Sequence, residues 1–111
     1  MPLMSIETNQ PLDNKETLAS LSSAVSSLLS KPESYVMLKF EHNTDMLFAG
    51  TDQPLAHIKL KSLGLPEDRT QLFSADICEL MQQHFKIPAD RIYIEFSNPE
   101  RHLWGWNSST F

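Results

Sequence analysis

Pro2 follows the initiator Met1 directly, so removal of the methionine would expose a free secondary amine on a rigid ring. An α-amino group is only partly protonated near neutral pH, and burial lowers its pKa further. A free Pro2 nitrogen is therefore suited to act as a general base without help from a histidine. Proline is also a common second residue, and its position alone favours a plain N-terminus over a catalytic base.

Composition limits the partners and the cellular setting that a site at Pro2 can have. The 111 residues fit a single domain, residues 1–111, and the 41% of hydrophobic residues are enough for a core. A net charge of -5 and a pI near 5.2 argue against a nucleic-acid or membrane partner, since both need a basic surface. No apolar run approaches the roughly 20 residues of a membrane span, and no signal peptide is visible, so a cytoplasmic protein is expected.

The sequence gives little support for a metal site or for a reactive thiol. Cys78 is the single cysteine, so no internal disulfide can form, and it is predicted to be a buried helix residue. The chain's four histidines share no metal-ligand spacing, and neither a metal site nor a cofactor is predicted.

Hydrophobic periodicity predicts the elements that must position Pro2. Strands are expected at residues 3–8, 35–41, 46–49, 55–63 and 92–96. One helix is expected to begin after Asp13 or Asn14 and to end at Lys31-Pro32. The second is expected from Pro66 or Glu67 to Phe85. Its predicted apolar stripe is Leu72, Phe73, Ile77, Leu80, Met81 and Phe85.

The two helices give the chain a weak internal repeat. Each is preceded by a strand and leads into another, which makes two β-α-β units of roughly 50 residues. Right-handed crossovers then predict an α+β fold, with a mixed four-stranded sheet and both helices on one face. The other face would be bare, which predicts that copies of the chain assemble against it.

Several short segments are spread along the whole chain. They are Met1-Pro2, Lys31-Pro32, Tyr35, Ser62-Leu63-Gly64, Asp90-Arg91-Ile92-Tyr93-Ile94 and Gly105-Trp106-Asn107-Ser108-Ser109-Thr110-Phe111. The N-terminal proline and the closing motif are specific when they occur together. This pattern resembles the macrophage migration inhibitory factor family, within the tautomerase superfamily.

This resemblance implies a homotrimer whose three sheets form a barrel, with active sites between neighbouring subunits. It implies that Pro2 is the catalytic base and that Lys31 pairs with the substrate carboxylate. The Leu63 amide, beside Ser62, would contact the same carboxylate, and Tyr93 would come from the neighbouring subunit. Further pocket positions match Tyr35, Trp106 and Phe111.

The implied chemistry is keto–enol interconversion of a small aromatic α-keto acid such as phenylpyruvate. The reaction needs a base for the carbon-bound proton, and positive charge and hydrogen-bond donors for the carboxylate and the developing enolate. Lysines near Pro2 would also keep its amine neutral, because a like charge disfavours protonation.

The chain departs from the family's pattern in several places. Leu55-Ala56-His57-Ile58 stands where the animal cytokine has a Cys-x-x-Cys pair, so thiol–disulfide exchange is not supported. Leu12 and Asn43 replace its receptor-linked arginine and aspartate, which argues against receptor binding. Within the pocket, Glu95 replaces an asparagine and would repel an anionic substrate, and Trp104 replaces a smaller residue and would narrow the pocket.

Two other functions remain open on the sequence. One is a cytokine-like interaction protein with an incidental pocket, released by a route that needs no signal peptide. The other is a different reaction of the superfamily, such as dehalogenation or decarboxylation, in which the proline acts as an acid.

Overall fold

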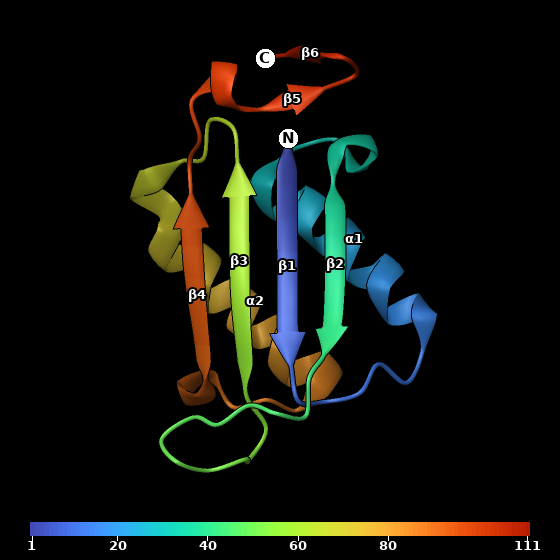
Figure 1. The fold of residues 1–111 in the computed structure, drawn as a ribbon, viewed down its shortest axis with the longest axis vertical. Coiled ribbons are helices and arrows are strands. Elements are labelled where there is room, and N and C mark those ends of the chain that lie inside the picture. Colours follow the sequence, from blue (N-terminus) through green and yellow to red (C-terminus); the bar gives the residue numbers. More distant parts are fainter.

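Both helices lie on one face of a four-stranded mixed sheet in the computed structural model, which describes residues 1–111 (Figure 1). The strand order is β2-β1-β3-β4; β1 pairs with β2 and β3 with β4 in parallel, while β1 and β3 are antiparallel. Two β-α-β units therefore share one sheet, which confirms the predicted fold class. The elements are β1 Pro2–Thr8, α1 Lys15–Leu29, β2 Met37–His42, β3 Ala56–Ser62, α2 Thr70–Phe85 and β4 Ile92–Ser97.

Local signals account for the ends of the helices. The Asn14 side chain accepts the Glu16 N–H at 2.8 Å and caps α1, as such side chains do at a helix N-terminus. Ser30 and Lys86 follow α1 and α2 in the left-handed conformation that terminates a helix. Neither helix is long and apolar enough to cross a membrane.

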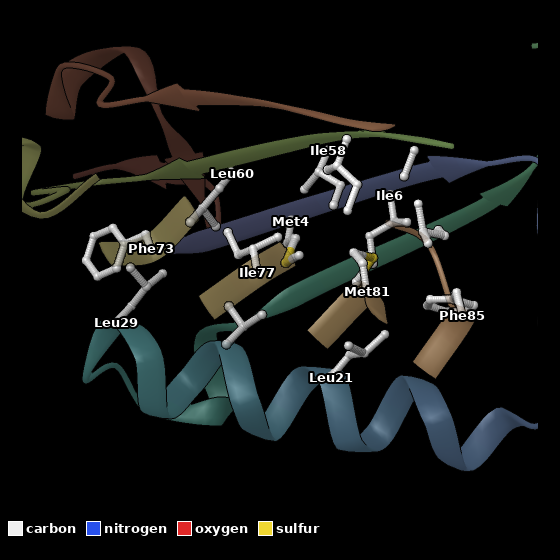
Figure 2. Close-up of a cluster of buried hydrophobic side chains, with 14 of the residues drawn as sticks. Met4, Ile6, Leu21, Leu29, Ile58, Leu60, Phe73, Ile77, Met81 and Phe85 are labelled. Carbon is white, nitrogen blue, oxygen red and sulfur yellow. The ribbon is translucent and has the colours of Figure 1, made fainter. Parts of the chain in front are cut away.

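The core lies between the helices and the sheet. Alternate residues of β1 and β3 point toward the helices, and these side chains are the buried ones. Residues one helical turn apart on α1 and α2 pack against them, as Figure 2 shows. The labelled members of this cluster are Met4, Ile6, Leu21, Leu29, Ile58, Leu60, Phe73, Ile77, Met81 and Phe85.

Two local predictions were wrong. No strand forms at residues 46–49, because Ala49 and Gly50 both take positive φ angles and reverse the chain between Phe48 and Thr51. Leu72 was placed on the buried stripe of the second helix but is 58% exposed. The stripe instead follows Phe73 and its neighbours four residues apart, which face the sheet.

The sheet face away from the helices is polar and charged. His57, Lys59 and Lys61 alternate with the buried residues of β3. The same alternation in β1 leaves Glu7 on this face, and its partners in register, Glu41 and His57, lie beside it. A partner covering this face would therefore meet charged side chains instead of an apolar surface.

The C-terminal tail forms a small hairpin that the sequence did not predict. β5 Gly105–Trp106 pairs with β6 Ser109–Thr110, and Asn107 and Ser108 have φ angles of 52° and 64°. Two successive positive φ angles are typical of the tight turn that suits a hairpin's twist. In Figure 1 the hairpin lies above the N-terminal end of β1, at the end of the sheet opposite the β2–β3 loop.

Candidate active site

Pro2 begins β1 and lies beneath the C-terminal hairpin. It pairs with Ser62 of β3, and its ring is almost completely buried. Met1 acylates the Pro2 nitrogen in this chain, so the nitrogen is an amide here and becomes a basic amine only after Met1 is removed.

A hollow of about 230 Å³ surrounds this end of β1. Most of its lining is hydrophobic, and it brings together three of the predicted pocket residues with Pro2, namely Tyr35, Trp104 and Trp106. Tyr35 comes from the 3₁₀ turn Glu33–Tyr35 that leads into β2, while both tryptophans come from the tail. Segments from the start, the first third and the end of the chain thus meet at Pro2.

Aromatic contacts hold this lining together. Trp106 meets the Tyr35 ring edge-on, with centroids 6.0 Å apart, and stacks on Phe111 at 6.0 Å with planes 11° apart. Both geometries are favourable for aromatic pairs. The Lys61 ammonium lies 5.7 Å from the centre of the Trp104 ring, a favourable cation–π distance. Phe111, which was predicted to line the pocket, does not line this hollow. Its ring instead supports Trp106, which does.

Burial and two nearby cations act on the chain's N-terminal amine. Burial lowers the pKa of the Met1 amine most, and the positive charges of Lys31 and Arg101 lower it further. Pro2 adjoins Met1 and is buried, so we expect the same influences to act on a free amine at Pro2. The arrangement therefore favours a neutral, basic amine at this place.

Lys31 is positioned by the end of α1. Its N–H donates to the Ser26 carbonyl at 3.0 Å, and the Ser26 hydroxyl donates to the Lys31 carbonyl at 2.5 Å. These bonds fix the Lys31 backbone where the chain leaves α1. Lys31 lies near the end of the sheet at which β1 begins, close enough to act on the N-terminal amine.

Ser62 and Leu63 lie where β3 ends, beside Pro2. Both residues are buried, and the Ser62 hydroxyl donates to the Leu63 carbonyl at 3.3 Å. The predicted role of the Leu63 amide in binding a carboxylate stays a prediction.

Tyr93 and Glu95 do not join Pro2 within one chain. Tyr93 pairs with His57, which pairs with Glu7, so it lies five residues along the sheet from Pro2, or roughly 17 Å at 3.3 Å per residue. The Glu95 carboxylate accepts a hydrogen bond from Nε2 of His57 on the open sheet face. Both residues belong to β4, an edge strand, and Tyr93 is 68% exposed.

Arg101 and Met37 are among the residues near the amine that were missed on the sequence. Arg101 lies in the 3₁₀ turn Arg101–Leu103, and Met37 of β2 lines the hollow. No local pattern pointed to either residue, because each is brought there by folding of the tail or by the path of β2.

Cys78 lies on α2 away from this hollow. It is partly buried, and burial raises the pKa of its thiol, which makes it a weak nucleophile. No group of histidine, cysteine, aspartate and glutamate side chains in the fold is arranged to hold a metal ion.

Comparisons with known proteins agree with this architecture. The model of the macrophage migration inhibitory factor (MIF) family matches residues 1–111. A macrophage migration inhibitory factor homolog of Brugia malayi is 35% identical to the chain, covering 100% of it and 99% of the relative.

Solved structures give the same result. A homologue of the factor from Prochlorococcus marinus is 42% identical with a TM-score of 0.89, and covers 98% of both chains. The factor from Trichinella spiralis is 31% identical with a TM-score of 0.92, covering 98% of this chain and 99% of that one. The family is part of the tautomerase superfamily, which supports an isomerase in general. The fold, the whole-length match and these identities show that the chain belongs to the macrophage migration inhibitory factor family.

Proposed function

We propose that the chain is a keto–enol tautomerase of phenylpyruvate-like α-keto acids, with Pro2 as its general base once Met1 has been removed. The observation that carries the proposal is the surroundings of the N-terminus. Pro2 is buried in an aromatic hollow, and burial, Lys31 and Arg101 lower the pKa of the adjoining Met1 amine.

In this proposal the neutral Pro2 amine removes a proton from the carbon next to the substrate's keto group. The protonated amine then returns a proton to the other end of the enolate system. Lys31 and the Leu63 amide hold the carboxylate, and the cations stabilise the negative charge that develops on oxygen. The aromatic side chains around the hollow contact the substrate's phenyl ring.

The complete site requires a second copy of the chain. Neither Tyr93 nor Glu95 lines the hollow around its own Pro2, but both are on the exposed edge strand β4. A homotrimer would bring β4 of one subunit to Pro2 of the next. Because the open sheet face is charged, the centre of such a trimer would be hydrated.

The alternative role as a cytokine-like partner has less support from the positions that would carry it. Leu12 packs against the hydrophobic core, and the Asn43 amide donates to Oε2 of Glu7 at 2.9 Å. Both positions therefore serve internal contacts, which favours the enzyme over the receptor ligand.

The deciding experiment is a steady-state assay with phenylpyruvate on protein whose N-terminus has been shown by mass spectrometry to be Pro2. Pro2→Gly also allows removal of Met1 but replaces the ring amine, and it should reduce kcat/KM about a hundredfold or more. Unchanged turnover in this variant would rule out the proposed base.

A cleavable N-terminal extension provides the matched control. The extended chain has the same side chains, but its Pro2 nitrogen is an amide that cannot accept a proton. It should be folded and inactive, and cleavage that leaves Pro2 first should restore activity.

A further inference from the structure

The Arg91 side chain makes four hydrogen bonds, and the proposed reaction does not use it. It ends the 3₁₀ turn Ala89–Arg91 and lies two residues before Tyr93. Its guanidinium donates to four backbone carbonyls of the β2–β3 loop at 3.0–3.1 Å. The acceptors are Phe48, Thr51, Gln53 and Pro54.

These bonds hold a tight turn of the loop. Phe48 and Thr51 exchange backbone hydrogen bonds of 3.0 and 3.1 Å across Ala49 and Gly50. Ala49 has a φ of 53°, a conformation that a residue with a Cβ seldom adopts. Arg91 donates to the carbonyls at both ends of this turn, and the five donors of a guanidinium in a fixed fork suit that task.

The turn brings the Phe48 ring into contact with both Arg91 and Tyr93. The guanidinium carbon of Arg91 lies 5.3 Å from the centre of the Phe48 ring. The Phe48 and Tyr93 ring centroids are 4.8 Å apart with planes at 50°. Tyr93 is 68% exposed on an edge strand, where it pairs with His57, and the Phe48 ring is the aromatic neighbour that it contacts.

We infer that Arg91 is a positioning residue, which acts through Phe48 to hold the Tyr93 ring in one orientation on the edge of the sheet. The inference rests on the proposed function, in which Tyr93 enters the substrate pocket of a neighbouring subunit. Pre-ordering the ring before substrate arrives lowers the entropic cost of binding and so lowers KM. Arg91 touches no substrate in this scheme, and the site it serves is not its own subunit's.

Nuclear magnetic resonance tests the packing without any assay. The chain has two tyrosines, Tyr35 and Tyr93, so tyrosine-labelled protein has two ring signals to assign. Phe48→Ala and Arg91→Lys should move the Tyr93 ring signals toward those of an exposed tyrosine and leave Tyr35 unchanged. A Tyr93 signal that stays in place in both variants overturns the inference.

Kinetics tests the consequence. Phe48→Ala and Arg91→Lys should raise KM for phenylpyruvate about threefold to tenfold with a smaller change in kcat, as expected for loss of one aromatic contact. Phe48→Tyr keeps a ring and should retain the wild-type KM. Leu47→Ala, on the same loop but 70% exposed, is the matched control and should also be unchanged.

A double-mutant cycle separates positioning from general damage to the fold. In a Tyr93→Ala background, Phe48→Ala should raise KM no further, because the ring it positions is absent. Additive effects would overturn the inference. If the enzyme is active but Phe48→Ala leaves its KM unchanged, this inference alone is overturned. If the wild-type chain with a free Pro2 is inactive, the proposed function is overturned as well.

Discussion

The Trp106 ring meets the Tyr35 ring edge-on at 6.0 Å, and this contact joins the C-terminal hairpin to the turn before β2, directly beside Pro2. Two segments separated by 70 residues of chain thereby close one side of the hollow. Trp106 is nevertheless 53% exposed, so its contacts shape the site without belonging to the core.

Trp106→Ala should therefore affect substrate binding more than stability. We expect KM for phenylpyruvate to rise several-fold, because the variant loses its contacts with both Tyr35 and Phe111. The KM for pyruvate, which has no phenyl ring, should change little. Leu103→Ala, a 71% exposed change in the same tail, is the control, and an equal effect of both variants would contradict the role of Trp106.

The pH dependence of the reaction should report the Pro2 amine. The amine acts as a base only when neutral, so kcat/KM should fall as pH decreases through its pKa. Burial, Lys31 and Arg101 lower the pKa of the Met1 amine, and the same influences should place the pKa of the adjoining Pro2 amine below the ordinary range of an α-amino group.

Arg101→Gln should move the midpoint of this profile to higher pH, since removing a positive neighbour makes protonation of the amine easier. The measurement is kcat/KM for phenylpyruvate against pH for both proteins. Lys15→Gln removes a lysine at the far end of α1 and should leave the midpoint in place. A midpoint that does not move in Arg101→Gln would show that this cation has no influence on the base.

Glu95→Gln tests whether the carboxylate of Glu95 opposes the binding of an anion. The glutamine side chain retains an acceptor for the His57 N–H, so the change removes charge with little loss of hydrogen bonding. KM for phenylpyruvate should fall about twofold to fivefold at low salt, and the difference should shrink as salt is added. Glu79→Gln, on the outer surface of α2, should have no such effect, and an unchanged KM in Glu95→Gln would place Glu95 outside the pocket.

Two neighbouring substitutions on α2 test the packing of the core. Phe73 is 1% exposed, and Phe73→Ala should lower the free energy of unfolding by about 3–5 kcal/mol, from lost burial and the cavity left behind. Leu72 is 58% exposed, and Leu72→Ala should change it by less than about 0.5 kcal/mol. Urea denaturation at one fixed protein concentration measures both, and equal losses would contradict the orientation of the helix.

Much of the fold could be predicted because its elements follow local rules. Alternation marked β3 and β4, and Asp13 or Asn14 marked the start of α1, where the structure has Asn14 as the cap. The rotation of α2 was partly mistaken, since Leu72 and Phe73 are both apolar and only the position of the sheet decides which one is buried.

The amino-acid sequence determined the chemistry available to this protein: a proline that can become an N-terminal base, a lysine at a helix end, and aromatic residues in the tail. It also determined the two β-α-β units, because periodicity and capping act over a few residues. Only the tertiary structure decided which of these residues meet. Folding of the tail places Trp104 and Trp106 beside Pro2 and Arg101 near the N-terminal amine, and strand register places Tyr93 five residues along the sheet from Pro2. Those outcomes depend on contacts between distant segments, which no local pattern in the chain encodes.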